Sequence, residues 1–240
     1  MGRTIIVTGA SKGIGRAAAS LLAQDGWSVI GLARSAPADF PGEFHQVDFA
    51  DAVATQRLAE RFAARGEIVG IVNNSGAARA ESFGSIDPAE MFAMIAFNLR
   101  PALQLTQAIL PNMRAARFGR VVNITSMVTR GLPLRASYGA AKAALESLTR
   151  TIASENATAG ITANAVAPGP TETELFRANS PPGSASEARY LAQIPMRRFA
   201  APAEIASAIA FLASEGAGFI TGQTLFVDGG AGLGAPAASS

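Results

Sequence analysis

Short runs of β-branched and other apolar residues alternate with longer Ala- and Leu-rich stretches along most of this chain. Apolar runs of this length are typical of strands buried on both faces, and the longer stretches have the spacing of helices. The pattern predicts strands over residues 4–8, 27–33, 44–47, 68–73, 120–125, 162–167 and 224–227. It predicts helices over residues 14–25, 51–65, 88–114, 137–156 and 202–213.

Strands that alternate with helices predict a parallel sheet, because each return to the same end of the sheet needs a crossover connection. Right-handed crossovers then give an α/β fold of the Rossmann type, a doubly wound parallel seven-stranded sheet with helices on both faces. We expect a single domain over residues 1–230, since no repeat or linker divides it. Residues 171–200 are expected to form an irregular lid over the substrate, and residues 231–240 a flexible tail.

A glycine-rich turn follows the first predicted strand and leads directly into a helix. In Thr8-Gly-Ala-Ser-Lys-Gly-Ile-Gly15, the glycines permit a tight turn and a close approach of the backbone to a pyrophosphate. The free N–H groups at the start of the helix would bind that anion. The turn lacks the Gly-Lys-Ser/Thr ending of nucleoside triphosphatases. The sequence therefore predicts a dinucleotide site that includes Gly9, Ser11, Lys12, Gly13, Ile14 and Gly15.

The end of the second predicted strand indicates which dinucleotide is bound. NAD-binding folds of this type place a carboxylate there, which holds the ribose 2′-hydroxyl. This chain has Ala33 followed by Arg34, and Lys12 lies in the glycine-rich turn. Two cations without an acid suit a 2′-phosphate, so NADP(H) is favoured and NAD(H) is the alternative. Both side chains could instead be merely solvated.

Tyr138 and Lys142 are four residues apart in a predicted helix and therefore share one helical face. A free phenol titrates near pH ~10. A cation at about 4 Å, with an effective dielectric constant of roughly 20, would favour the phenolate by about 4 kcal/mol, or about 3 pKa units. The pair therefore predicts an acid/base group for neutral pH. The spacing alone also fits a tyrosine at the edge of the core beside a solvated lysine.

The composition narrows the chemistry further. The chain has no cysteine, which excludes thiolate catalysis, and its single histidine, His45, argues against a Ser-His triad or a His-based metal site. The net charge of +2 gives no basis for a nucleic acid partner, and no apolar run is long enough to span a membrane. We expect no metal and a cytoplasmic protein.

Together these segments resemble the short-chain dehydrogenase/reductase family over nearly the whole chain. Residues 8–15 are similar to its Thr-Gly-x-x-x-Gly-x-Gly turn, Asn73-Asn-Ser-Gly76 to its Asn-Asn-Ala-Gly turn, and residues 138–142 to its Tyr-x-x-x-Lys motif. Residues 168–173 resemble its Pro-Gly-x-x-x-Thr segment, and residues 219–230 its last strand.

The resemblance implies an NADP(H)-dependent oxidoreductase that interconverts a ketone and a secondary alcohol. It implies that Tyr138 exchanges a proton with the substrate oxygen, that Lys142 lowers the pKa of this tyrosine, and that Ser126 hydrogen-bonds the carbonyl. Asn98 would position a water molecule between Lys142 and solvent. The implied cofactor contacts are Asp48, Asn74, Ser75, Gly76, Tyr138, Lys142, Pro168, Gly169, Thr171 and Thr173. Three of these residues also have a purely structural alternative. Asn98 could bond only to the backbone, Asp48 could be a helix N-cap, and Thr173 could be a turn residue.

The substrate is the least defined feature. Residues 194–199 and the C-terminal motif resemble ketoacyl reductases, which favours a 3-oxoacyl thioester, although Ala159 stands where carrier-protein-dependent members often have a basic residue. Sugar, polyol or cyclic alcohol dehydrogenase activity, or a non-catalytic dinucleotide-binding sensor, are the alternatives. We expect residues 127–135 and 171–200 to select the substrate, with Arg130 and Arg135 solvated rather than anion-binding. The resemblance also implies a homodimer or homotetramer packed through residues 88–114 and 137–156.

Overall fold

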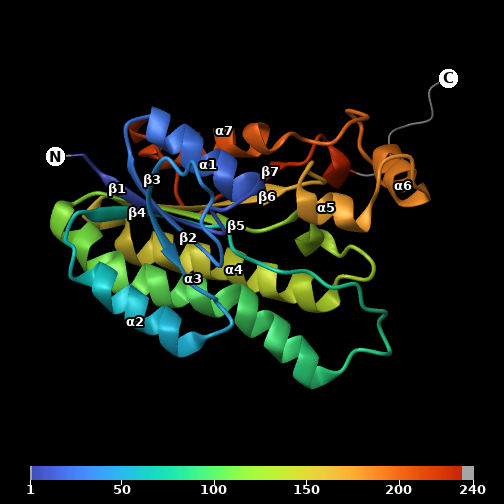
Figure 1. Ribbon diagram of the computed structural model, residues 1–240, viewed down its shortest axis with the longest axis horizontal. Helices are drawn as coiled ribbons and strands as arrows, with labels where there is room; N and C mark the ends of the chain where they lie inside the picture. Colours follow the sequence, from blue (N-terminus) through green and yellow to red (C-terminus); the bar gives the residue numbers. More distant parts are fainter. Residues whose placement is uncertain (1, 234–240) are drawn as a thin grey trace.

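A parallel sheet of seven strands forms the centre of the computed structural model, which describes residues 2–233 (Figure 1). The strands lie in the order β3-β2-β1-β4-β5-β6-β7 and every neighbouring pair is parallel. Their bounds are β1 (Thr4–Thr8), β2 (Ser28–Ala33), β3 (Gly42–Gln46), β4 (Ile68–Asn73), β5 (Gly119–Ile124), β6 (Ile161–Pro168) and β7 (Thr224–Val227). The predicted fold class is confirmed.

Helices cover both faces of the sheet, as Figure 1 shows. One face carries α1 (Gly13–Gln24) and α7 (Pro202–Ala213), and the other carries α2 (Ala52–Ala63), α3 (Pro88–Ala116) and α4 (Ala136–Asn156). Every residue of β1, β4, β5 and β6 is buried, which explains why apolar residues predominate in these strands without alternation.

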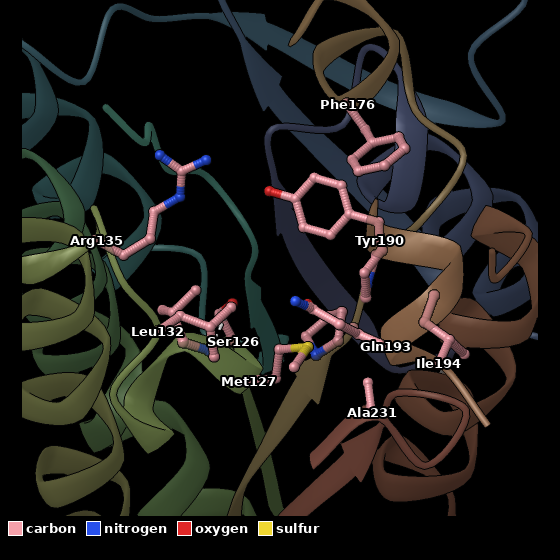
Figure 2. A pocket seen from close by; sticks show the side chains of 13 residues that line it. Ser126, Met127, Leu132, Arg135, Phe176, Tyr190, Gln193, Ile194 and Ala231 are labelled. Carbon is pink, nitrogen blue, oxygen red and sulfur yellow. Dashed lines mark hydrogen bonds between the residues drawn. The ribbon is translucent and has the colours of Figure 1, made fainter. Parts of the chain in front are cut away.

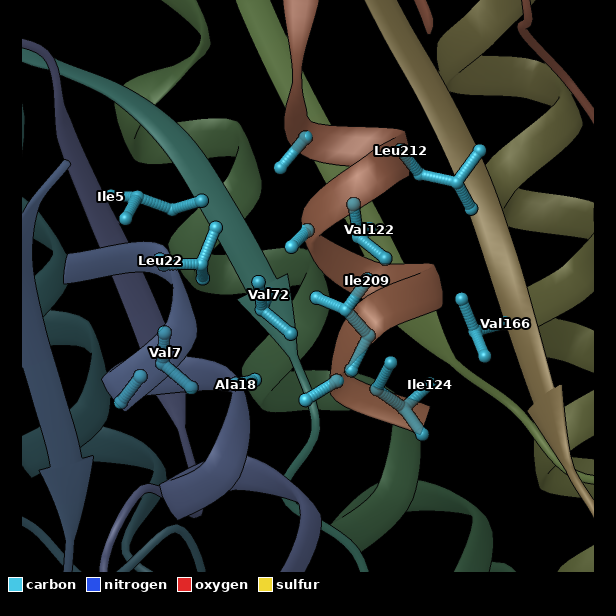
Figure 3. Packing of buried hydrophobic residues seen from close by; sticks show 14 of the residues in the cluster. Ile5, Val7, Ala18, Leu22, Val72, Val122, Ile124, Val166, Ile209 and Leu212 are labelled. Carbon is cyan, nitrogen blue, oxygen red and sulfur yellow. The ribbon is translucent and has the colours of Figure 1, made fainter. Parts of the chain in front are cut away.

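Each face has its own hydrophobic core. Beneath α1 and α7, the side chains of Val7, Leu22 and Ile209 belong to one cluster of fully buried residues (Figure 3). Beneath α2 and α3, Phe62 and Ile109 belong to the other cluster. Burial of a side chain of this size stabilises the fold by about 1.5–3 kcal/mol each, so the two clusters hold the helices firmly against the sheet.

The strand order places one crevice at the carboxyl ends of the strands. From β1 the chain winds outward through β2 to β3, and it then returns to β4 on the other side of β1. A ligand site is expected at such a reversal, where the loops after adjacent strands diverge. The glycine-rich turn follows β1, residues 74–76 follow β4, and Ser126 follows β5, so all three lie at this end of the sheet.

Residues 171–200 differ from the prediction, because they contain two helices instead of an irregular segment. These are α5 (Glu174–Asn179) and α6 (Ala185–Gln193), which begin after the N-caps Thr173 and Ser184. Residues 231–233 likewise form a 3₁₀ turn instead of loose chain, and Asp228 accepts hydrogen bonds from Gly230 N and Gly232 N at 2.9 Å. The rest of the predicted flexible tail, 234–240, lies outside the described residues. None of the helices in residues 2–233 has both the length and the apolar character needed to cross a membrane.

Candidate active site

The glycine-rich turn forms a cradle that side chains would fill. Gly9 and Gly13 have φ angles of +67° and +55°, which favour glycine. A Cβ atom on Gly15 would lie 2.3 Å from the carbonyl oxygen of Gly9 and 2.6 Å from Nδ2 of Asn74. Lys12, the N-cap of α1, makes no side-chain capping bond, so the start of the helix is left open. This cradle fits the pyrophosphate of a dinucleotide.

Asn74 supports this turn instead of pointing a free amide at a ligand. Its Nδ2 donates to the carbonyl oxygen of Thr8 at 2.9 Å. The Thr8 hydroxyl oxygen in turn accepts from the backbone N–H groups of Asn74 and Ser75, both at 2.9 Å. The loop after β4 is therefore tied to the turn after β1, and Asn74 fixes the shape of the cradle.

The cations and the acid that the sequence assigned to the cofactor lie on the surface beside this cradle. Lys12 and Arg34 are exposed, at the start of α1 and just beyond the end of β2. Asp48 is exposed too, and its Oδ1 accepts from Ala50 N at 3.0 Å. Asp51, not Asp48, caps α2 by accepting from Val53 N and Ala54 N. The helix-cap alternative for Asp48 is therefore wrong.

Ser126, Tyr138 and Lys142 converge beyond the end of β5. Ser126 Oγ accepts from Val128 N at 3.3 Å, which leaves its proton available for another acceptor. Tyr138 lies in the first turn of α4, half-buried, and Ser126 hydrogen-bonds its phenol. Lys142 is 2% exposed, with Nζ 5.6 Å from the centre of the Tyr138 ring.

The electrostatics of this pair differ from the sequence prediction. Burial raises the pKa of Tyr138 to about 12, and the hydrogen bond from Ser126 and the charge of Arg135 offset only part of this. Burial also lowers the pKa of Lys142 to about 8, and its Nζ donates to the Ile124 carbonyl oxygen at 2.8 Å. The predicted direction for the tyrosine was wrong, because helical spacing takes no account of desolvation. At neutral pH the phenol of the cofactor-free site carries its proton.

The lowered pKa of Lys142 has a measurable consequence for stability. Between pH 8 and 10.5 the unfolded chain holds the lysine proton and the folded protein does not, so this group makes the free energy of unfolding rise with pH. The rise is expected to reach about 3 kcal/mol across that window. Denaturant titrations at several pH values, without cofactor, should show the wild type gaining stability relative to Lys142→Met. A difference that is independent of pH would contradict the lowered pKa.

Asn98 approaches Lys142 from α3. Its Oδ1 accepts from Ala77 N at 3.2 Å and its Nδ2 donates to the carbonyl oxygens of Ala77 and Met94 at 3.0 and 2.9 Å. A Cβ atom on Gly76 would lie 2.7 Å from Asn98 Oδ1 and 3.2 Å from Lys142 Nζ. The backbone contacts expected if Asn98 has only a structural role are thus present. The side-chain oxygen Oδ1 of Asn98 also lies near Lys142. Its role toward a water molecule stays a prediction.

A mostly apolar pocket, partly open to solvent, lies beside Ser126. Figure 2 shows Arg135 on one wall and Tyr190 on the other, with Ser126 and Met127 between them. Both segments expected to select the substrate contribute to it. The lining residues are Ser126, Met127, Val128, Leu132, Arg135, Pro168, Gly169, Pro170, Phe176, Tyr190, Gln193, Ile194 and Ala231.

Several of these residues were not singled out from the sequence. Tyr190 and Gln193 lie within α6, and their spacing of three residues was an available signal. The Pro, Gly and Ser residues before α6 are typical of loops, so the sequence pattern did not predict this helix. Ala231 comes from a segment expected to be loose.

The segment after β6 packs closely against both the cofactor cradle and the pocket. The Thr171 hydroxyl donates to the carbonyl oxygen of Gly169 at 3.0 Å and is buried. Thr173 caps α5, accepting from Phe176 N at 3.1 Å, and a Cβ on Gly13 would lie 3.2 Å from its Cγ2. Thr173 is therefore a helix N-cap instead of a turn residue, and its methyl group faces the glycine-rich turn. Cofactor contacts by these residues stay predictions.

The two arginines of residues 127–135 have different surroundings. Arg130 is not a free solvated side chain: its guanidinium lies 3.9 Å from the centre of the Phe226 ring and donates to the carbonyl oxygen of Gly232. Arg130 thereby connects the 3₁₀ turn at residues 231–233 to the segment that follows Ser126. Arg135 lines the pocket instead. In residues 2–233, no three His, Cys, Asp or Glu side chains gather in a way that could hold a metal.

Comparison with known proteins agrees with this geometry. Residues 9–232 match the family model described as Enoyl-(Acyl carrier protein) reductase. The chain is 40% identical over 239 residues to the 3-oxoacyl-[acyl-carrier-protein] reductase FabG of Escherichia coli, covering 95% of this chain and 97% of that protein. A structure from Beutenbergia cavernae, provisionally named an NAD(P) dependent gluconate 5-dehydrogenase and holding NADP at low occupancy, has a TM-score of 0.89 at 34% identity over 95% of this chain and 96% of its own. The aldohexose dehydrogenase of Thermoplasma acidophilum has a TM-score of 0.89 at 30% identity over 100% and 97%.

Proposed function

The chain belongs to the short-chain dehydrogenase/reductase family, and we propose that it uses NADP(H) to interconvert a ketone and a secondary alcohol. The observation that carries this proposal is the convergence of Ser126, Tyr138 and Lys142 beside an apolar pocket. The glycine cradle that fits a dinucleotide lies at the same end of the sheet. The proposed positions of the cofactor, the proton donor and the substrate thus all lie at this end of the sheet.

In the direction of reduction, the protein supplies orientation and a proton. Ser126 donates a hydrogen bond to the carbonyl oxygen of the substrate and polarises it. Tyr138, protonated at neutral pH, gives its proton to that oxygen as negative charge develops there. Lys142 stands one helical turn away and stabilises the phenolate that results. Bound NADPH supplies the hydride.

Reprotonation of Tyr138 completes the cycle. With a pKa of about 8, Lys142 exchanges protons readily near neutral pH. Asn98 Oδ1 and Lys142 Nζ both lie close to Gly76, so one water molecule hydrogen-bonded to the two groups would connect them. We propose that this water carries the proton from solvent, with Asn98 as its positioning residue.

The proposed substrates fall into two classes. A 3-oxoacyl thioester is supported by the similarity to FabG of Escherichia coli, named as a 3-oxoacyl-[acyl-carrier-protein] reductase. A sugar or sugar acid is the second class, since proteins named for gluconate and aldohexose share the fold closely. Arg135 in the pocket favours this second class, because an acyl chain offers it no partner.

Arg34 is expected to carry much of the preference for NADP(H). We propose that its exposed guanidinium binds the ribose 2′-phosphate together with Lys12. Arg34→Ala should therefore weaken NADPH binding by roughly ten- to hundredfold and leave NADH binding nearly unchanged. Titration of both cofactors measures this ratio, and Arg61→Ala, an exposed arginine of α2, is the matched control. Equal weakening of both cofactors would exclude recognition of the 2′-phosphate by Arg34.

A non-catalytic dinucleotide sensor is the rival function. Both functions predict binding of NADPH, but only the enzyme consumes it when a ketone is added. Turnover with a panel of thioesters, sugar acids and cyclic ketones therefore separates them. Bound NADPH that no ketone in the panel oxidises would favour the sensor.

We also propose that the protein assembles as a homodimer or homotetramer through α3 and α4 and acts in the cytoplasm. Phe92 and Leu103 of α3 are 69% and 38% exposed. Ala143 of α4 is exposed as well, and its small side chain permits close approach of a second helix. These features support burial of this face against another copy of the chain.

A further inference from the structure

Arg135 is the one charged residue that lines the substrate pocket in the part of the chain that the structure describes. The other lining side chains are mainly apolar, with Ser126, Tyr190 and Gln193 as the polar exceptions. We propose that the substrate carries a carboxylate and that Arg135 binds it, which makes the substrate class a small hydroxy acid or oxo acid. This inference rests on the proposed function and adds to it the group that determines specificity.

The guanidinium of Arg135 is not neutralised by the residues around it. Other arginines in residues 2–233 form ion pairs, as Arg79 does with Glu81 at 2.6 Å and Arg198 with Glu204 at 2.6 Å. Arg135 forms no such pair within this range. Its one hydrogen bond from the guanidinium is a long contact of 3.4 Å from Nη1 to the carbonyl oxygen of Leu134. Most of its five N–H donors are therefore available to a ligand.

The carboxylate of Glu81, whose backbone adjoins that of Arg135, is already occupied. Glu81 forms a backbone bridge with Arg135, but its side chain accepts from Arg79 and from the hydroxyl of Ser137. These two donors lower the pKa of Glu81, which shows that its charge is already stabilised. Arg79 and Ser137 thus stabilise the charge of Glu81, and the Arg135 guanidinium takes no part in this interaction.

The position of Arg135 relates the carboxylate to the reacting carbonyl. Arg135 precedes Tyr138 by three residues and is the N-cap of α4, where the positive end of the helix adds to its charge. Its charge also acts on the pKa of the Tyr138 phenol. A substrate whose carbonyl is held by Ser126 and Tyr138 could therefore also present a carboxylate to Arg135 in the same pocket.

The opposite wall suits the rest of such a substrate. Tyr190 and Gln193 offer a hydroxyl and an amide across the pocket from Arg135 (Figure 2). Apolar walls formed by Met127, Leu132 and Phe176 keep the local dielectric constant low, which strengthens an ion pair in the pocket. An acyl chain without a carboxylate would contact the apolar walls. It would also remove water from the Arg135 guanidinium without offering a partner, which is unfavourable.

Matched acid and neutral substrates test this proposal. We would measure kcat/KM for oxidation by NADP⁺ of 3-hydroxybutanoate against its ethyl ester, and of gluconate against gluconamide. The wild type is expected to prefer the acid of at least one pair by about tenfold or more, and Arg135→Gln to lower this ratio by roughly ten- to hundredfold, mainly through KM. Arg135→Lys should retain part of the preference. An effect of Arg135 on the reactivity of Tyr138 changes kcat/KM for the acid and for the neutral compound alike, so it cancels in their ratio. The control is Arg150→Gln, at an exposed arginine of the same helix, which should leave this ratio unchanged.

Each other outcome overturns the inference. Wild-type turnover of neutral alcohols or ketones equal to or better than that of the acids would refute it and leave the proposed function standing. An equal loss of both members of a pair in a folded Arg135→Gln protein would show that Arg135 acts on the reaction, not on the carboxylate. If NADPH binds but neither these four compounds nor the panel of thioesters, sugar acids and cyclic ketones reacts, the inference and the proposed function both fail.

Discussion

Replacing Tyr138 by phenylalanine is expected to lower kcat for ketone reduction by roughly 100- to 10,000-fold, the usual contribution of a positioned acid or base. The substitution removes the only atom that the proposed chemistry requires of this side chain, its proton-bearing oxygen. The ring remains to fill the half-buried site in the first turn of α4. Steady-state NADPH oxidation measures the loss of kcat, and a cofactor titration should show NADPH binding within a few-fold of the wild type.

Tyr190 provides the matched comparison, because it is the only other tyrosine of the chain. It lines the opposite wall of the same pocket, so Tyr190→Phe removes an identical hydroxyl from a place where no proton transfer is proposed. This variant should change KM more than kcat. Loss of kcat in both variants to the same degree would mean that Tyr138 has no special role in the reaction.

Gly15→Ala is expected to weaken NADPH binding by roughly ten- to hundredfold, because it puts a methyl group into the cradle. That methyl would lie 2.3 Å from the carbonyl oxygen of Gly9 and 2.6 Å from Asn74 Nδ2. Neither atom can move freely, since Asn74 Nδ2 is bonded to the carbonyl oxygen of Thr8 and the Gly9 oxygen belongs to the backbone. Overpacking of this kind costs about 1–3 kcal/mol, which corresponds to the expected loss if the turn moves away from the cofactor.

The control for Gly15→Ala is Gly216→Ala, where a Cβ would meet only the Ser214 hydroxyl at an ordinary 3.5 Å. Calorimetric titration with NADPH compares the two variants, and thermal unfolding reports how much stability each has lost. Full NADPH affinity in a folded Gly15→Ala protein would show that the cofactor does not depend on the close packing of this turn.

The sequence allowed the sheet and the positions of the reactive residues to be predicted, because both follow from short-range patterns. Strands such as β1 and β4 are mostly apolar without alternation, which is typical of a parallel sheet covered on both faces. The pairing of Tyr138 with Lys142 follows from helical spacing, and the glycines of residues 9–15 follow from the shape of the turn.

The remaining features depend on tertiary contacts that no local pattern contains. Burial, not the neighbouring lysine, dominates the pKa of Tyr138, and it also lowers the pKa of that lysine. Arg130 and Arg135 are similar in sequence context, yet one packs on Phe226 and the other enters the pocket. The helices α5 and α6 are short, and their stability depends on packing and on caps such as Thr173 and Ser184.

The central claim is that this site joins hydride transfer from NADPH to protonation of a ketone oxygen. The most direct test is to supply NADPH carrying deuterium at the transferable position, together with a 3-oxoacyl thioester or an oxo sugar acid. The account predicts a secondary alcohol with one deuterium on the carbinol carbon for each NADPH consumed. Bound NADPH that yields no labelled alcohol from either ketone would contradict it.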